Sequence, residues 1–206
     1  MVESTPTGSA KPAPGNREKL LRAAIVCLRD KGYAATTARD LAAVSDANLA
    51  SIGYHFGGKE ALLNEAVAET TRAWAKSIED EAFSGPPAGA EEHLRRALSA
   101  TADRFAEHEP YLRSFVEAFP PALRSPELRE MMAEAYGEVR AAGEAMLERL
   151  LGDEIEPEHI RTLSSMIVAL CDGLILQWLL DPEAIPRSDQ MIDALSMLAT
   201  APAPER

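Results

Sequence analysis

The stretch "TTARDLAAVSDANLASIGYHFGGKEALLNEAV", Thr36–Val67, determines the fold that the chain is expected to adopt. Thr37 followed by Asp40 resembles a capping-box pattern for a short helix, with Thr36 or Thr37 as the cap. The polar turn "SDAN", residues 45–48, ends that helix, and a second short helix follows until a pair of glycines stops it. Two helices of about two turns each, separated by a polar turn, predict a helix-turn-helix motif.

Helical patterns continue on both sides of this motif. Apolar residues at helical spacing upstream predict a helix that ends at Lys31-Gly32, and a long helix is predicted to begin at Lys59. No strand pattern occurs in the sequence, so we predict an all-α fold. Breaks at prolines and glycines separate the remaining predicted helices, which span residues 90–107, 111–119, 126–151, 157–180 and 188–200.

Composition divides the chain into three parts. Residues 1–15 are rich in Pro, Ser, Thr and Gly and have no periodic apolar face, which predicts a disordered tail. Residues 16–62 are predicted to form the helix-turn-helix domain, and residues 63–206 a larger all-helical domain. The long helix from Lys59 would join the two domains. With 46% hydrophobic residues among 206, the chain has enough apolar side chains to bury a proper core.

Charge is distributed unevenly between the two predicted domains. The chain carries a net charge of −12, which by itself argues against a nucleic-acid partner. Residues 16–60, however, contain seven Lys or Arg against five Asp or Glu, a net charge of +2, so residues 61–206 carry −14. Because an acidic surface repels phosphates, only the N-terminal part is expected to approach DNA.

Membrane, redox and metal signals are weak. No apolar run approaches the ~20 residues that span a bilayer, and the N-terminal residues contain no hydrophobic signal core. We therefore predict a cytoplasmic protein without a membrane partner. Cys27 and Cys171 lie far apart in apolar helical patterns, which favours buried thiols over a metal-binding pair. We expect no cofactor and no metal.

A distinctive motif covers the end of the second short helix and the start of the next. Tyr54-His55-Phe56 is followed, after two glycines, by Lys59-Glu60-Ala61-Leu62. Within Arg17–Val67 the chain resembles the DNA-binding domain of TetR-type (tetracycline-repressor-like) transcriptional regulators, which typically have an aromatic-Tyr-His-Phe end to the third helix and a Lys-Glu-x-Leu start to the fourth. The sequence departs from that pattern at Gly53, where a second aromatic residue is common, and at Gly58, where Ser or Thr is usual.

The resemblance implies which residues would contact DNA. The second short helix would enter the major groove, while hydroxyls, amides and cations around it would bind phosphates. Gly53 lowers the stability of this helix and few long donors project from it, so readout of DNA shape is expected to contribute. A helix cap is the alternative role for Asn48, and a solvated surface charge the alternative for Arg39. The candidate DNA-binding residues are Thr36, Thr37, Arg39, Asn48, Leu49, Ala50, Ser51, Gly53, Tyr54, His55 and Lys59.

The segment "LSSMIVALCDGLILQWLL", Leu163–Leu180, is apolar on nearly every face. Burial on both sides of a thin helical domain requires a partner as well as the chain's own core, and the resemblance implies a dimer interface made by the last two helices. A homodimer would bind an inverted-repeat operator, whereas a central helix of a monomer is the alternative. The candidate interface residues are Met166, Leu170, Gly173, Leu174, Gln177, Met191, Leu195 and Leu198.

The resemblance also implies a small-molecule pocket in the acidic domain. Aromatic, thioether and polar side chains there suit a hydrophobic effector of unknown identity, although each residue alone also fits a plain core. A ligand is expected to weaken operator binding by moving the long helix from Lys59, and this coupling must be reciprocal. The candidate pocket residues are Phe105, Tyr111, Phe115, Phe119, Met131, Tyr136, Met146, Met166, Gln177 and Trp178.

Two other functional classes remain open from the sequence. His108 stands between Glu107 and Glu109, a set able to ligate a metal or act as a general base, but adjacent helical residues point about 100° apart. A helical protein-binding adaptor with a degenerate helix-turn-helix fits the modest charge of +2 in residues 16–60. The residues favour a third class, a dimeric DNA-binding repressor that is not an enzyme.

Overall fold

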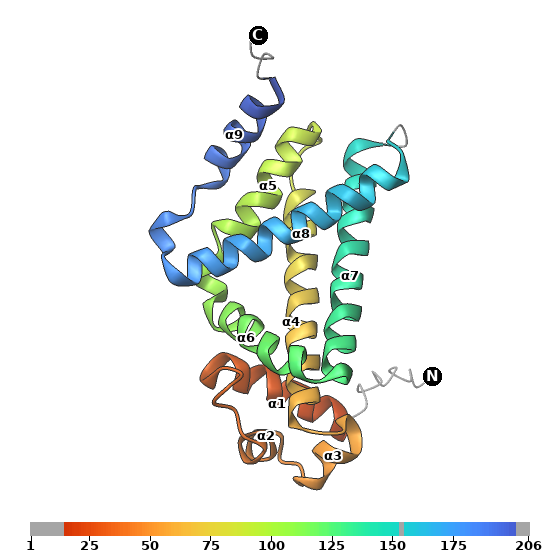
Figure 1. The fold of residues 1–206 in the computed structure, drawn as a ribbon, viewed down its shortest axis with the longest axis vertical. Coiled ribbons are helices and arrows are strands. Elements are labelled where there is room, and N and C mark those ends of the chain that lie inside the picture. Colours follow the sequence, from red (N-terminus) through yellow and green to blue (C-terminus); the bar gives the residue numbers. More distant parts are fainter. Residues whose placement is uncertain (1–14, 153–154, 201–206) are drawn as a thin grey trace, which may run out of the picture.

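The computed structural model describes residues 15–152 and 155–200, without the side chains of residues 198–200. The predicted tail, residues 1–15, lies outside this description except for Gly15. In the described part the chain is helical and has no strand, which confirms the all-α prediction (Figure 1). The helices are α1 Asn16–Lys31, α2 Ala38–Ser45, α3 Ala50–Phe56, α4 Lys59–Ala82, α5 Ala90–Ala102, α6 Phe105–Arg124, α7 Pro126–Leu151, α8 Pro157–Leu180 and α9 Ser188–Thr200, with a 3₁₀ turn at Pro182–Ala184.

Local sequence explains the ends of α2 and α3. The Thr37 hydroxyl accepts from the Asp40 amide at 3.2 Å, and the Asp40 carboxylate accepts from the Thr37 amide at 2.9 Å, which completes the predicted capping box. A hydrogen bond from Lys31, with those from Thr37, lowers the pKa of Asp40. Gly57 ends α3 at a φ of 81°, a left-handed conformation that glycine adopts without a steric penalty.

The first hydrophobic core lies where α1, α2 and α3 pack against the start of α4. Leu20, Leu28, Leu41 and Leu62 are completely buried in it, because their helical spacing places each of them on the inward face of its helix. The same core includes Ala118 of α6. The helix-turn-helix domain predicted for residues 16–62 therefore also packs on a helix of the larger domain.

The larger domain is built from α4 to α9. In Figure 1, α4 runs from the helix-turn-helix domain along α5 and α7, and α8 crosses in front of them before α9 returns beside α5. A second core cluster contains Phe105, Leu112, Leu174, Ile175 and Ile192, with further residues packed against it. This core joins α6, α8 and α9.

Helix α6 runs through two positions where the sequence predicted breaks. Pro110 and the pair Pro120-Pro121 all lie inside the continuous helix Phe105–Arg124, and α5 ends earlier than predicted, at Ala102. A proline in a helix interior costs about 3 kcal/mol in lost hydrogen bonding and steric clash. The buried face of α6 lies in both core clusters, and this packing outweighs the local penalty.

Helix α8 is longer and more apolar than we predicted for any segment of the chain. Pro157–Leu180 is long and apolar enough to cross a membrane by length and composition, with a mean hydropathy of 1.8, so the statement that no apolar run approaches this length was wrong. Such a helix also occurs in soluble proteins as a core or interface helix. Only 17% of its most apolar window is buried within the chain, which leaves an apolar face uncovered.

Candidate nucleic-acid interface and ligand cavity

The outer face of α3 is mainly apolar and exposed. Leu49 is 49% exposed and Tyr54 85% exposed, while Ile52 anchors the opposite face in the first core. Ala50 and Gly53 are also exposed, and a Cβ added at Gly53 would meet no other atom within 4 Å. A helix held by one buried residue and presenting small side chains can approach another surface closely.

Several side chains next to this face make contacts within the protein. Ser51 is half-buried, and the Tyr54 ring meets the His55 ring edge to face at 4.8 Å between centroids. The Asn48 side-chain oxygen accepts from the Ala50 amide at 3.0 Å, and its backbone carbonyl accepts from the Ser51 amide at 2.8 Å. Leu49 is the N-cap residue of α3, and the Asn48 side chain just before it satisfies the first backbone amide of that helix.

The structure separates the two adjacent threonines. Thr36 is buried, and its hydroxyl donates to the Gly32 carbonyl at 2.6 Å, so it does not lie on the outer surface as predicted. Thr37 is exposed and caps α2. Arg39 is exposed and has no hydrogen bond or ion pair among the described residues.

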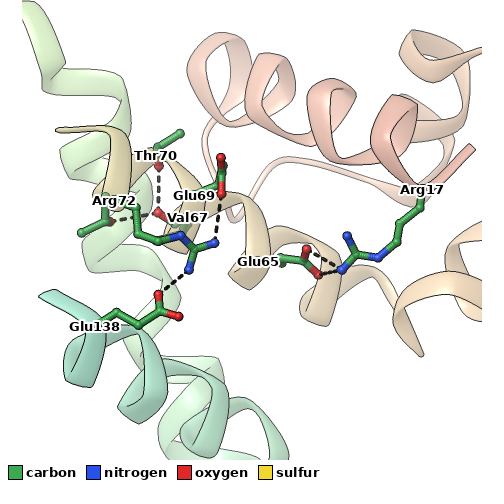
Figure 2. A network of polar contacts seen from close by, with 8 residues as sticks. Arg17, Glu65, Val67, Glu69, Thr70, Arg72 and Glu138 are labelled. Carbon is green, nitrogen blue, oxygen red and sulfur yellow. Dashed lines mark hydrogen bonds and ion pairs between the residues drawn. The ribbon is translucent and has the colours of Figure 1, made fainter. Parts of the chain in front are cut away.

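Lys59 is held at the junction between α2 and α4. Its ammonium donates to the Thr36 backbone carbonyl at 3.1 Å and lies 3.5 Å from the Glu60 carboxylate. Arg17 donates to both Glu65 carboxylate oxygens, at 2.6 and 2.8 Å (Figure 2). Its guanidinium also lies over the Phe56 ring. These contacts fasten α1 and α3 to α4.

A cavity of about 820 Å³ lies among α4, α5, α6, α7 and α8. Half of the predicted pocket residues line it, and they come from α6 and α7: Tyr111, Phe115, Met131, Tyr136 and Met146. The wall also includes polar residues that the sequence reading did not select, among them Asn64, Arg72, Trp74, His108 and Asp172. A lone carboxylate within an apolar helical segment was the sequence signal available for Asp172.

The other five predicted pocket residues lie outside the cavity wall. Phe105 is completely buried in the second core, where its ring meets Trp178 at 5.8 Å between centroids. Phe119 packs its ring edge against Phe115. Met166 and Gln177 are exposed on the outer face of α8. Helical spacing identified apolar positions but did not indicate which way each one faces.

Two buried donors in the cavity wall have no hydrogen-bond partner within the described part of the chain. They are Nδ2 of Asn64 and Nε1 of Trp74. The Asn64 oxygen accepts from the Tyr33 hydroxyl at 2.7 Å, and Trp74 stacks on His108 at 5.5 Å between ring centroids. Because both groups line the cavity, each is placed to donate a hydrogen bond to a molecule inside it, either water or a ligand.

A tyrosine–aspartate pair crosses from α7 to α8 in the same wall. The Tyr136 hydroxyl donates to Asp172 Oδ2 at 2.6 Å. Burial raises the pKa of Tyr136, and it also raises the pKa of Asp172 although the hydrogen bond from Tyr136 opposes this. Next to Asp172, burial raises the pKa of the Cys171 thiol to about 11, so this thiol is protonated at neutral pH.

The outer face of α8 and part of α9 form an apolar surface. Met166, Leu170 and Leu195 of the predicted interface are exposed there, with Met166 at 62%, and Gly173 is half-buried. Leu174 and Met191 instead pack in the second core, because they lie on the inward faces of their helices. The Leu198 side chain falls outside the described residues. Exposed positions that the prediction omitted include Leu163, Leu176 and Leu180.

The alternative metal site is not assembled in the described residues. No group of three His, Cys, Asp or Glu side chains there is arranged to hold a metal ion. His108 instead stacks on Trp74, and its Nδ1 lies 3.1 Å from the Arg104 carbonyl.

Comparisons with known proteins agree with this arrangement of a small helical domain and a larger one. Residues 20–66 match the "Bacterial regulatory proteins, tetR family", and residues 90–201 match the "BetI-type transcriptional repressor, C-terminal" family. The second match alone spans more than half of the chain. The chain belongs to the TetR family of DNA-binding transcriptional regulators, which confirms the resemblance seen in Thr36–Val67.

Solved structures share the fold over most of the chain. A "putative transcriptional regulator" from Rhodococcus sp. RHA1 aligns with a TM-score of 0.71 at 18% identity, covering 90% of this chain and 95% of its own. The regulator SCO7518 from Streptomyces coelicolor A3(2) has a TM-score of 0.65 at 27% identity, covering 91% and 100%. The "multidrug binding protein EbrR complexed with proflavin" has a TM-score of 0.63 at 26% identity, covering 89% and 99%.

A curated relative matches a shorter part of the chain. It is the "Probable HTH-type transcriptional regulator YttP" of Bacillus subtilis (strain 168), 30% identical over 78 residues. This match covers 38% of the present chain and 38% of the relative.

Proposed function

We propose that the protein is a cytoplasmic, dimeric repressor that binds an inverted-repeat operator through α3 and is released by a small hydrophobic ligand in the cavity. The observation that carries this proposal is the position of α6, which borders the cavity on one face and holds the helix-turn-helix domain on another. A ligand that moves α6 would change the position of α1 and, with it, that of α3.

Two polar contacts support transmission through α6. The Ser114 hydroxyl donates to the Leu28 carbonyl at 3.1 Å, and a Glu117 carboxylate oxygen accepts from the Ala34 amide at 2.9 Å. Tyr111 and Phe115, on the same helix, line the cavity. The long helix α4 provides a second route, because it runs from the first core along the cavity wall.

The exposed apolar face of α8 supports the dimer. A helix with so little of its apolar surface covered in one chain gains stability when a second copy covers that face. A two-fold pair would place two α3 helices about 34 Å apart, one turn of B-DNA. The surface on α3 and its flanks would then provide the contacts to DNA, from Thr37, Arg39, Asn48, Leu49, Ala50, Ser51, Gly53, Tyr54, His55 and Lys59.

The ligand is proposed to be hydrophobic because most of the cavity wall is apolar. The structural neighbour EbrR, described as a multidrug binding protein and solved with proflavin, supports the proposal that a protein of this fold binds a small molecule.

Selection of bound fragments from the source genome tests DNA recognition. We expect an inverted repeat among the selected fragments, and light scattering is expected to give about twice the 22.3 kDa mass of one chain. Bound fragments without two-fold symmetry, or a particle of 22.3 kDa at micromolar concentration, would contradict the dimeric repressor. Screening small molecules for release of the selected fragment then tests control by a ligand.

A further inference from the structure

The acidic side chains in the cavity wall differ in whether a cationic side chain of the protein pairs with them. Arg72 donates to Glu69 at 3.0 Å and to Glu138 at 2.7 Å (Figure 2). Glu79 lies 3.1 Å from Lys76 and 2.5 Å from Arg149. Each of these three wall carboxylates therefore has at least one cationic partner in the protein.

Asp172 has no cationic partner among the described residues. The hydroxyl of Tyr136 is the polar group that contacts its carboxylate. A carboxylate that is partly removed from water is costly unless a cation compensates it, and burial accordingly raises the pKa of Asp172. Its hydrogen bond to Tyr136 requires an acceptor but does not require a negative charge, so a role in joining α7 to α8 leaves the charge itself unexplained.

The surroundings of Asp172 suit a positively charged molecule. The wall contains four carboxylates against the two cations of Arg72 and Lys76. Aromatic rings of Trp74, Tyr111, Phe115 and Tyr136 also line the cavity, and the face of an aromatic ring attracts a cation, more strongly where water is excluded. An anionic ligand would be repelled by the carboxylate of Asp172, which lacks a cationic partner among the described residues.

We infer that the ligand is a hydrophobic organic cation whose positive charge lies against Asp172 and whose apolar body lies among the aromatic residues of the cavity. This inference rests on the proposed function, since it names the chemical class of the ligand for the same cavity. Asp172 is the binding residue for the charge, and Tyr136 orients its carboxylate through the hydrogen bond from α7.

Two ions of nearly equal size and opposite charge test the inference: tetraphenylphosphonium and tetraphenylborate. Binding to the full-length protein is measured by titration calorimetry and by quenching of tryptophan fluorescence, since Trp74 lines the cavity. We expect the wild type to prefer the phosphonium ion. Asp172→Asn, which keeps an acceptor for Tyr136, is expected to weaken phosphonium binding by about tenfold or more.

Matched variants separate this charge from the general acidity of the domain. Glu134→Gln removes one negative charge from an exposed position of α7 outside the cavity wall, and we expect phosphonium affinity within about twofold of the wild type. Tyr136→Phe retains the charge of Asp172 and is expected to retain the preference for the phosphonium ion. Circular dichroism establishes that each variant is folded.

The possible results decide between the inference and the proposed function. Tighter binding of the borate, equal phosphonium affinity of wild type and Asp172→Asn, or no phosphonium binding overturns the cation site. Asp172-dependent binding of phosphonium that leaves DNA affinity unchanged supports the cation site and contradicts release by a ligand. Fluorescence anisotropy of a selected DNA fragment with added phosphonium provides this second measurement.

Discussion

The core beneath α3 and the wall of the ligand cavity differ in how completely their buried polar side chains are hydrogen-bonded. In the first core, Thr36 and Ser45 are buried and their hydroxyls donate to backbone carbonyls at 2.6 and 2.7 Å. In the cavity wall, Thr101 and Ser164 also donate to backbone carbonyls, but Asn64 and Trp74 each retain a buried donor that has no partner among the described residues. The hydrogen-bonded hydroxyls stabilise the DNA-binding region as it is. The unpaired donors of the cavity wall would instead form hydrogen bonds with a ligand that carries acceptors, and this would favour its binding.

Truncation of an apolar side chain should give the largest difference between the two regions in the free energy of unfolding. Leu28→Ala, in the completely buried core, is expected to lower the free energy of unfolding by about 3 kcal/mol. Met146→Ala, in the cavity wall, should cost about 1 kcal/mol, because its side chain already borders open space. Urea denaturation of both variants measures the difference, and equal losses would show that the cavity wall is packed as tightly as the core.

Removal of one hydroxyl in the first core or of one indole N–H in the cavity wall should destabilise the protein to different extents. Tyr33→Phe removes the donor to the Asn64 oxygen, so we expect a loss of about 1–2 kcal/mol in stability. Trp74→Phe removes an unpaired donor, and its loss should be smaller than truncation of an equally buried apolar ring would cause. Thermal melting measures both, with Tyr54→Phe, at an exposed position, as the control. A larger loss for Trp74→Phe than for Tyr33→Phe would contradict the assignment of the unpaired donor.

Two aspartates should give stability an opposite dependence on pH. The pKa of Asp40 is lowered by Lys31 and Thr37, so its contribution is present above the unfolded-state pKa and is lost as the pH falls through the folded value. The pKa of Asp172 is raised by burial, so its folded form binds a proton more tightly and stability falls as the pH rises through that window.

Asparagine substitutions at the two positions test these signs. Asp40→Asn should destabilise the protein most at neutral pH, with a smaller effect in acid. Asp172→Asn should instead stabilise the protein relative to the wild type at neutral pH, and this gain should shrink in acid. Melting temperatures of both variants and the wild type, measured from pH 3 to pH 7, test these expectations. If the two substitutions change stability with the same dependence on pH, the contrast between the regions is wrong.

The smallest expected effect concerns Lys59. Its ammonium is held near the Thr36 carbonyl and remains partly exposed, in a position to neutralise one phosphate. Lys59→Ala should weaken operator and random DNA by similar factors and lower the salt slope by about 1 for each half-site. Lys76→Ala, at an ion pair in the larger domain, serves as the control. A loss confined to operator DNA, with an unchanged salt slope, would falsify a phosphate-binding role.

Local signals predicted much of the DNA-binding region. The capping box at Thr37 and Asp40, the glycine stop after Phe56 and the start of α4 at Lys59 all depend on residues close together in sequence. The cavity depends on α4 to α8, whose wall residues Asn64 and Ile175 are more than one hundred positions apart in sequence. For this reason the sequence reading selected five of the residues that line the wall and five that do not.

The sequence alone determined that the chain is helical, that it contains a helix-turn-helix motif and that its motif resembles the TetR family. Helical periodicity and end signals suffice for this, because they act within one helix. Tertiary structure alone decided that Thr36 is buried beside exposed Thr37, that Pro110 lies inside α6, and that Asp172 faces the cavity while Met166 faces outward. Helix α8 is apolar nearly all round and so carries no amphipathic signal; the direction of each side chain is set by the helices that pack against it.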